Sequence, residues 1–380
     1  MRKLTTAFCL FCALTMGAQN KYSNPVIDTS LPDPTIIKAD DGYFYLYATE
    51  NIRNVPIYRS KNLVDWRYMG TCFNEQTRPQ MVPDGGIWAP DINLIDGKYV
   101  LYYSKSRWGG EWECGIGVAT ADSPRGPFTD VGKLFISSEI GVQNSIDPFY
   151  IEDEDGSKWL FWGSFRGIYG IELSHDGLSV KPGAEKVQIA GTLTEGTYIY
   201  KHDGYYYLFG SAGTCCEGLN STYRVMVARS ESLLGPYVNK AGFEALENNF
   251  TVVLQKSPKV VGPGHNSEIV RDDAGQYWVF YHGFDANDPD AGRKLYMDQL
   301  TWDKSGWPTI SNRIPSTTAN APVFGEQAGI SIPDFQPAGS DGLDSEKSYY
   351  SLAGVRVDEP TAGIYIERTC DGKSRKNVLK

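Results

Sequence analysis

One hydrophobic pattern recurs five times along the chain: a polar turn that contains glycine, followed by a strand of aromatic and aliphatic residues. The five segments are DDGYFYLYAT (40–49), IDGKYVLYYS (95–104), EDGSKWLFWGS (154–164), HDGYYYLFGS (202–211) and DAGQYWVFYHG (273–283). Their turn glycines are Gly42, Gly97, Gly156, Gly204 and Gly275, separated by 48 to 71 residues. A glycine turn between two apolar runs predicts a β-hairpin.

The spacing of these hairpins indicates the fold class. Each hairpin is followed by another alternating strand, and the interval between hairpins is the length of a four-stranded sheet. No amphipathic helical pattern of any length separates the units. A repeat on this scale predicts an all-β chain, a five-bladed β-propeller with a short C-terminal extension. The alternative is a β-sandwich built from unrelated hairpins.

The residues that open the innermost strands of a propeller gather at one end of its axis. Counting nine residues back from the first four turn glycines reaches Asp33, Trp88, Asp147 and Glu195, and counting ten back from the fifth reaches His265. A structural scaffold would favour one residue type in every blade, and a multivalent lectin would repeat its site. The asymmetric set therefore indicates a single active site.

The start of the chain has the pattern of a secretory signal peptide. Arg2 and Lys3 precede an apolar stretch (4–16) and two small residues, so residues 1–18 are interpreted as the signal. The apolar stretch is shorter than a membrane-spanning helix, and no later segment comes close to one. We therefore expect an exported protein without a membrane span, located in the periplasm, at the cell surface or outside a bacterial cell.

The pattern changes again after the fifth repeat. The propeller is predicted over residues 19–310, and residues 311–344, rich in Pro, Gly, Ser and Ala, are interpreted as a closing segment and linker. Residues 345–380 contain short alternating runs and resemble the sorting or anchoring tails of exported bacterial proteins. A frayed tail without function is the alternative.

The net negative charge of the chain disfavours negatively charged binding partners. The chain has 36 Lys and Arg against 46 Asp and Glu, a net charge of -10, and no basic run. Nucleic acid, anionic lipid or a polyanionic substrate would therefore meet like-charge repulsion. A neutral partner, such as an uncharged polysaccharide or oligosaccharide, fits better.

Five cysteines remain once the signal is removed: Cys72, Cys114, Cys215, Cys216 and Cys370. Export would permit disulfides, but the spacing leaves their pairing open. The adjacent Cys215 and Cys216 are interpreted as a constraint on their loop rather than as a redox or metal site.

Three of the five residues predicted to gather at the end of the propeller axis are carboxylic acids: Asp33, Asp147 and Glu195. Like charges in one pocket raise one another's pKa, so such a site holds a proton. Hydrolysis of a glycosidic bond needs a protonated acid for the leaving oxygen and an ionised base for water. Pro34 and Pro148 predict extended conformations at Asp33 and Asp147. The alternative is that some of these acids only accept hydrogen bonds from backbone amides. Asp91 does not fit the nine-residue spacing and is expected to serve a strand turn.

At these residues the sequence resembles glycoside hydrolase family 43, from about Asn24 to Pro308. The matching motifs are NPVIDTSLPDPTII, WAPDINLIDGKYVLYYS, SIDPFYIEDEDG, TEGTYIYKHDGYYYLFGS, GPGHNSEIV and GRKLYMDQLTWDKSGWP. The resemblance implies a five-bladed, inverting glycoside hydrolase. It further implies that Asp33 is the general base, Glu195 the general acid, and Asp147 the residue that orients Glu195 and raises its pKa.

Three further residues are candidates for binding. His265 matches a histidine that contacts a cation, often calcium, at the propeller axis; because calcium prefers oxygen ligands, a buried histidine held by its neighbours is the alternative. Arg293 matches an arginine that points at substrate hydroxyls, with a surface salt bridge as the alternative. Trp88 is expected to stack on a sugar face, with core packing as the alternative. No organic cofactor is expected.

Within the family, the WAPD and EGTY motifs look most like the arabinan-degrading branch, which cleaves α-1,5-linked L-arabinofuranose in plant polysaccharide. A β-xylosidase, an arabinoxylan-debranching arabinofuranosidase and a non-catalytic carbohydrate-binding propeller are the alternatives. A binding module has no use for both Glu195 and Asp147, which favours an enzyme. The loop SAGTCCEGLNSTYRV (211–225) departs from the expected pattern and leaves endo or exo action open.

Overall fold

The structure is a computed structural model that describes residues 20–325, 348–350, 356–357, 363–368 and 374–379. The chain divides into two compact units, residues 1–329 and residues 330–380, and each is described by itself. The predicted signal peptide (1–18) lies outside the described residues, as do residues 326–344 of the predicted linker.

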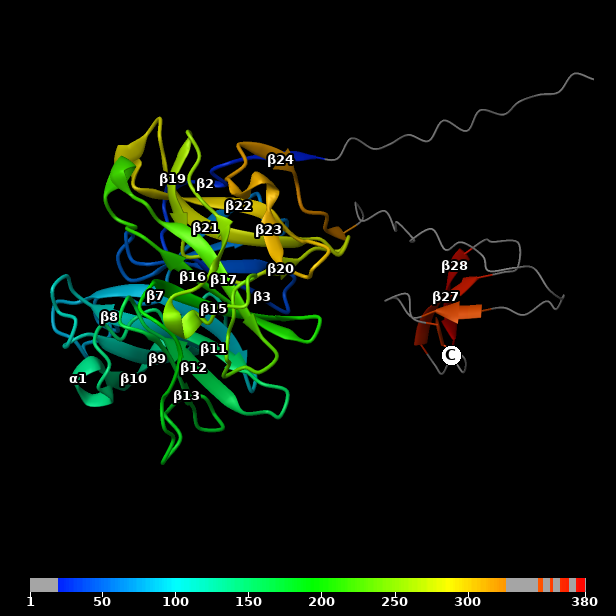
Figure 1. Ribbon diagram of the computed structural model, residues 1–380. Coiled ribbons are helices and arrows are strands. Elements are labelled where there is room, and N and C mark those ends of the chain that lie inside the picture. Colours follow the sequence, from blue (N-terminus) through cyan, green and yellow to red (C-terminus); the bar gives the residue numbers. More distant parts are fainter. Residues whose placement is uncertain (1–19, 326–347, 351–355, 358–362, 369–373, 380) are drawn as a thin grey trace, which may run out of the picture. The chain divides into compact units, whose positions relative to one another are not determined.

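Five antiparallel sheets in the first unit form the blades of a propeller, which confirms the predicted fold class (Figure 1). Blade one contains β3 (Thr35–Lys38), β4 (Phe44–Tyr47), β5 (Pro56–Ser60) and β6 (Arg67–Thr71). Blade two contains β7 (Gly86–Ile95), β8 (Lys98–Ser106), β9 (Gly115–Ala121) and β10 (Thr129–Ile136). Blade three contains β11 (Phe149–Glu152), β12 (Lys158–Trp162), β13 (Ile168–Glu172) and β14 (Val187–Ala190). Blade four contains β15 (Thr194–His202), β16 (Tyr205–Ala212), β17 (Arg224–Ser230) and β18 (Thr251–Leu254).

The fifth blade combines strands from both ends of the unit. Its later strands are β19 (Val260–Gly264), β20 (Val270–Arg271), β21 (Tyr277–Asp285), β22 (Arg293–Trp302) and β23 (Pro308–Ile310). The N-terminal strand β2 (Ile27–Ser30) pairs with β22 and completes this blade. Strand β1 (Lys21–Ser23) pairs with β24 (Thr318–Asn320), in the part of the chain predicted as a closing segment (Figure 1). The two ends of the propeller are thereby joined.

Helical structure is short in the described part of the chain. It consists of α1 (Ser137–Ile140) and four turns of 3-10 helix at Gly218–Asn220, Ala245–Glu247, Pro289–Ala291 and Ser311–Arg313. None of these described helices has the length and apolar character needed to cross a membrane.

The five turn glycines occupy the same place in their blades. Each lies in the turn before the second strand of a hairpin, and their φ angles fall between 77° and 82°. Glycine adopts this left-handed region without the steric cost that a Cβ brings. The common conformation confirms the predicted hairpins.

Hydrophobic clusters lie between neighbouring blades. In β4, Tyr45 and Tyr47 belong to the cluster shared with blade two, whereas Phe44 and Leu46 belong to the cluster shared with blade five. Both faces of this strand are therefore buried, and all four side chains are at most 1% exposed. This burial explains why the repeat is a continuous aromatic run rather than an apolar–polar alternation.

The second unit contains one antiparallel sheet of four short strands. They are β25 (Ser348–Tyr350), β26 (Arg356–Val357), β27 (Gly363–Arg368) and β28 (Ser374–Leu379), in the order β26-β25-β27-β28. A sorting or anchoring role for this tail stays a prediction.

Candidate active site

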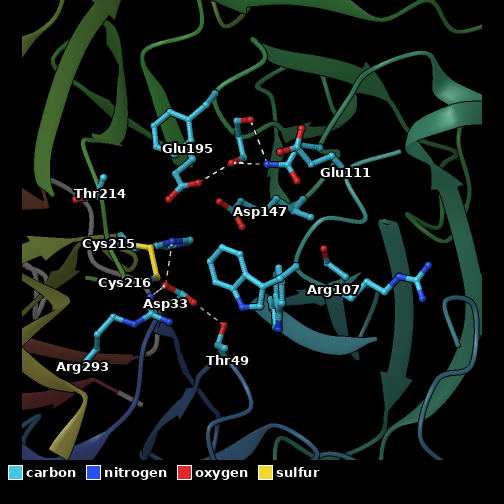
Figure 2. Close-up of a pocket in the computed structure, with 18 of the residues that line it drawn as sticks. Asp33, Thr49, Arg107, Glu111, Asp147, Glu195, Thr214, Cys215, Cys216 and Arg293 are labelled. Atoms are coloured by element: carbon cyan, nitrogen blue, oxygen red, sulfur yellow. Dashed lines mark hydrogen bonds and ion pairs between the residues drawn. A yellow bond between two sulfur atoms is a disulfide. The ribbon is translucent and has the colours of Figure 1, made fainter. Parts of the chain in front are cut away.

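All six site residues predicted from the sequence line one cavity of about 550 Å³ (Figure 2). They are Asp33, Trp88, Asp147, Glu195, His265 and Arg293. The volume is in the range of ordinary small-ligand sites. The register argument selected five of these residues, one from each blade, and Arg293, which the family resemblance implied, lines the same cavity.

The backbone at the mouth of the propeller differs from the prediction. Asp33 and Asp147 were expected to be extended, but their φ angles are 56° and 60°, and that of His265 is 51°. Only a few per cent of non-glycine residues adopt this left-handed region. Ala89 (φ 40°) and Gly196 (φ 63°) occupy the corresponding places in blades two and four. The conformation is thus a repeated feature, imposed by tertiary contacts despite the following prolines.

A ring of hydrogen bonds holds these five residues. The main-chain N–H of each one donates to a side chain of the preceding blade, with donor–acceptor distances of 2.6 to 3.2 Å. The acceptors, in blade order, are His282, Thr49, Ser104, Asp147 and Ser211. A strained residue persists only where its surroundings determine it, and here those surroundings are the neighbouring blade.

Trp88 and Glu195 lie one position before the left-handed residues of their blades. They are within the long strands β7 and β15, at irregularities in the pairing between Trp88 and Asp91 and between Glu195 and Tyr198. Bulges of this kind re-aim side chains next to active sites. Glu195 thereby reaches the cavity from inside a strand, whereas Asp33 precedes one.

The Asp33 carboxyl lies beside a hydroxyl group, a guanidinium and two imidazole rings. Its Oδ2 accepts a hydrogen bond from the Thr49 hydroxyl at 2.6 Å. Its Oδ1 lies 3.3 Å from Arg293 Nη1, 3.2 Å from His265 Nδ1 and 3.1 Å from His282 Nδ1. The Thr49 hydroxyl and the Arg293 guanidinium favour the ionised form of this carboxyl.

The balance of charge keeps Asp33 ionised. Burial works to raise its pKa, but Arg293 and the two histidines offset burial and hold the pKa well below its usual range. Burial also lowers the pKa of His265, and together with Arg293 it lowers the pKa of His282 to about 4. Both histidines are therefore neutral near pH 7, so Arg293 is the cation that stabilises the Asp33 carboxylate.

Glu195 has the opposite electrostatic character. Burial raises its pKa, and the negative charge of Asp33 adds to that effect. Two hydroxyls oppose the shift: Tyr223 donates to Oε1 at 2.8 Å, and Ser164 donates to Oε2 at 2.5 Å. The Asn144 amide donates to Ser164 Oγ at 2.9 Å, which directs the Ser164 proton toward Glu195. The effect of burial prevails, so the pKa of Glu195 is raised and the side chain can retain a proton.

Asp147 contacts the chain directly after Glu195. Its Oδ2 accepts the Gly196 N–H at 3.1 Å. Burial, followed by the charges of Glu195 and Asp33, raises the pKa of Asp147 well above its usual range. Two buried acids whose titrations are linked share the last proton between them. The Asp147–Glu195 pair therefore holds a proton at a pH where Asp33 is ionised.

The structure also places the remaining candidates. Trp88 is half-buried on the cavity wall, with its ring centroid 5.6 Å from that of Trp108, which is 81% exposed. This aromatic pair lines the cavity, and stacking of Trp88 on a sugar face stays a prediction. Arg293 is not part of a surface salt bridge, because its side chain is 16% exposed and pairs with Asp33.

The turn role predicted for Asp91 is wrong. Asp91 is buried within β7, and its carboxyl group accepts the Tyr150 N–H at 2.8 Å.

A calcium ion at His265 stays a prediction. Calcium takes six to eight oxygen ligands, whereas His265 offers nitrogen and lies against Asp33. Among the described residues, no group of three or more His, Cys, Asp or Glu side chains is placed to hold a metal. The side chains of the described residues therefore do not form a calcium cage.

Four functional neighbours were missed in the sequence: Thr49, Ser164, Tyr223 and His282. His282 carried a signal, because the chain has four histidines and this one interrupts the aromatic run YWVFYHGF. Its side chain is fully buried and stacks on the Tyr223 ring at a centroid distance of 5.6 Å. The other three are ordinary hydroxyl residues, and their contacts with Asp33 and Glu195 join segments that are separate in the sequence.

The cysteine pairing left open by the sequence is partly resolved. Cys215 and Cys216 form a disulfide with each other, and Cys72 and Cys114 are buried free thiols. Cys370 lies outside the described residues.

The fold and the site together define a class of protein. Three buried carboxyl groups from three blades face one cavity; the pKa of Asp33 is lowered, and the pKa values of the linked pair Asp147 and Glu195 are raised. Hydrolysis of a glycosidic bond requires such a combination of acids with low and raised pKa values, so the protein is a glycoside hydrolase with a β-propeller fold.

Comparison with known proteins specifies the family. The model of glycosyl hydrolases family 43 matches residues 22–308. The extracellular endo-α-(1→5)-L-arabinanase 1 of Bacillus subtilis is 36% identical over 73% of this chain and 87% of its own length. The extracellular exo-α-(1→5)-L-arabinofuranosidase of Cellvibrio japonicus is 31% identical over 81% of this chain and 92% of its own. A Cellvibrio cellulosa α-L-arabinanase structure, complexed with arabinohexaose, matches with a TM-score of 0.68 at 30% identity, over 75% of this chain and 98% of that one. The chain belongs to glycoside hydrolase family 43.

Proposed function

We propose that this protein is an exported arabinanase that hydrolyses α-1,5-linked L-arabinofuranosyl bonds in plant cell-wall polysaccharide and inverts the anomeric centre. The observation that carries the proposal is the electrostatic difference between two acids in the cavity: the pKa of Asp33 is lowered and the pKa of Glu195 is raised. The relatives that act on α-(1→5)-linked arabinose support the choice of substrate.

The proposed reaction assigns one step to each carboxyl group. Glu195 donates its proton to the glycosidic oxygen as the bond to the anomeric carbon breaks. Asp33 removes a proton from a water molecule, whose oxygen attacks the anomeric carbon from the opposite face. The product then has the inverted configuration, Asp33 is protonated and Glu195 is ionised. Exchange of protons with solvent restores the starting state.

The surroundings of Glu195 suit both of its charge states. Before proton transfer, burial and the charge of Asp33 favour the protonated acid. After transfer, the hydroxyls of Tyr223 and Ser164 donate to the new carboxylate. Hydrogen bonds to a charged group are stronger than those to a neutral one. These donors therefore stabilise the negative charge that develops as the leaving group takes the proton.

Asp147 acts in this scheme as a positioning residue. It holds the Gly196 N–H and thereby orients the peptide that follows Glu195. A negative charge on Asp147 also disfavours loss of the last proton from the pair.

Export is supported by the signal pattern at residues 1–18 and by both curated relatives, which are extracellular proteins. An exported enzyme of this kind would meet polymeric arabinan outside the cell. This part of the proposal is tested by fractionating the producing cells and sequencing the N-terminus of the mature protein. An N-terminus that still begins at Met1 would contradict it.

The activity is tested by incubating the protein with linear arabinan, arabinoxylan and aryl pentosides, and by sizing the products over time. We expect arabinose or arabino-oligosaccharides from linear arabinan. Proton NMR of the first product should show the anomer opposite to that of the substrate. Release of the same anomer, or hydrolysis restricted to xylosidic substrates, would overturn the proposal.

A further inference from the structure

An exposed disulfide lies on the wall of the catalytic cavity. Cys215 and Cys216, in the loop between β16 and β17, both line the cavity that contains the three carboxyl groups. Cys215 is half-buried and Cys216 is exposed. Figure 2 shows the bridge facing the same space as Asp33 and Glu195.

The loop that carries the bridge is tied at both ends. The Thr214 carbonyl accepts the N–H groups of Thr222 and Tyr223, each at 3.1 Å, and the Thr214 N–H donates to Thr222 Oγ1 at 3.1 Å. A Cβ at Gly213 would lie 2.6 Å from the Thr222 carbonyl oxygen, so the two strands of the loop approach as closely as glycine permits. The loop ends at Tyr223, which donates to Glu195. The bridge is therefore held in a fixed relation to that acid.

The bridge differs chemically from the carboxylates and the guanidinium that surround it. A disulfide between neighbouring residues closes a small ring, so neither side chain can rotate away from the cavity. Its sulfur atoms are polarizable and donate no hydrogen bond. Such a surface suits the C–H face of a sugar ring. If the hydroxyl groups of the sugar faced the disulfide instead, they would lack hydrogen-bond partners.

A redox role is less well supported by the same contacts. Exchange of a disulfide needs an attacking thiolate. In the described part of the chain the free thiols are Cys72 and Cys114; both are buried, and burial raises the pKa of each. Neither of these thiols is therefore available as a thiolate for exchange with the bridge.

We propose that the Cys215–Cys216 disulfide is a rigid, nonpolar contact surface for the C–H face of an arabinofuranose residue bound beside the scissile bond. This inference rests on the proposed function, and it makes the bridge a determinant of substrate specificity. The bridge takes no part in the chemical steps.

The experiment compares the wild type with the double variant Cys215→Ser/Cys216→Ser on arabino-oligosaccharides. We expect the KM of the double variant to rise about tenfold, the size of one modest apolar contact, while kcat stays within about twofold. Calorimetric titration of arabinotriose into the inactive Glu195→Gln protein, with and without the two serines, should show the same loss of affinity. Circular dichroism confirms that each variant is folded.

Two further variants separate sugar contact from loop stiffness. Cys215→Ala/Cys216→Met removes the bridge but returns a thioether to the wall, and it should recover part of the lost affinity. Thr222→Val keeps the bridge but removes the side-chain contacts to Thr214, and it should leave KM within about twofold of the wild type.

The outcomes distinguish this inference from the proposed function. Unchanged affinity in the double serine variant, with arabinan still cleaved by the wild type, would overturn the inference alone. An equal loss in Thr222→Val, with no recovery by methionine, would also overturn it by showing that the bridge only stiffens the loop. A wild-type protein that neither binds nor cleaves arabino-oligosaccharides would overturn the proposed function, and the arabinofuranose contact with it.

Discussion

The main-chain N–H of Gly196 donates a hydrogen bond to Oδ2 of Asp147 over 3.1 Å, across the boundary between blades three and four. In blades two, three and five the corresponding N–H is held by a serine or threonine hydroxyl, and in blade one it is held by a nitrogen of His282. At this one boundary a carboxylate has taken the place of a neutral acceptor. The same contact therefore positions the peptide after Glu195 and brings a second acid close to it.

Asp147→Asn should move the alkaline limb of the activity profile to lower pH. An asparagine side chain keeps an acceptor for the Gly196 N–H but carries no charge. Without a negative neighbour the pKa of Glu195 falls, and the acid then loses its proton at a lower pH. The measurement is kcat/KM against pH on linear arabinan. An unchanged alkaline limb with full activity would show that Asp147 acts on neither the proton nor the position of Glu195.

Glu195→Ala and Asp33→Ala should differ in the substrates that they can still cleave. General acid catalysis is worth about 10²- to 10⁴-fold, and a sugar leaving group needs it. Glu195→Ala should therefore lose most activity on arabinan but retain much of it on a dinitrophenyl arabinofuranoside, whose phenolate departs unaided. Water must be activated with either substrate, so Asp33→Ala should be poor on both.

Rates of these two variants on both substrates assign the roles, with circular dichroism as the control for folding. If Glu195→Ala loses the activated substrate as completely as the polymer, Glu195 is not the general acid.

Arg293→Gln should move the acid limb to higher pH. Arg293 offsets the effect of burial on Asp33 and holds its pKa low, so loss of the guanidinium charge raises that pKa. Asp33 is then protonated, and inactive as a base, at a pH where the wild type still works. Arg293→Lys keeps the positive charge and is the matched control, with a smaller shift expected. Identical acid limbs in the wild type and Arg293→Gln would contradict this assignment and leave Arg293 a binding residue.

Tyr223→Phe should move the alkaline limb in the opposite direction from Asp147→Asn. The Tyr223 hydroxyl donates to Glu195 and works to lower its pKa, so its removal raises the pKa. The same hydroxyl stabilises the carboxylate that forms in the reaction. A hydrogen bond to a charged group contributes about 1.5–3 kcal/mol, so kcat should fall by about tenfold or more. Phenylalanine retains the ring that stacks on His282, and a limb that moves to lower pH would contradict the assigned contact.

Much of this architecture could be predicted because it depends on local chemistry. Gly42, Gly97, Gly156, Gly204 and Gly275 mark five hairpins that need a left-handed residue at one turn position. The spacing from these turns to Asp33, Asp147 and Glu195 then follows from the lengths of the inner strands. Hairpin turns and strand lengths are properties of short segments, so a single sequence contains them.

The contacts that tune these acids join segments far apart in the chain. His282 accepts the N–H of Asp33 from 249 positions away, and Tyr223 reaches Glu195 from 28 positions away. The contact from His282 joins blade five to blade one and forms only when the ring of blades closes, whereas the contact from Tyr223 lies within blade four. Closure also holds Asp33 and Asp147 in the left-handed region that their prolines disfavour.

The sequence by itself thus determined the five hairpins, the fold class and the three acids, because turn chemistry and strand spacing are local. The roles of these acids were implied only by the family resemblance, and the tertiary structure supplies the physical cause, because it lowers the pKa of Asp33 and raises the pKa values of Asp147 and Glu195. Burial, Arg293 and the hydroxyls of Ser164 and Tyr223 set those pKa values. The distances between these groups do not exist until the blades fold and pack around one axis.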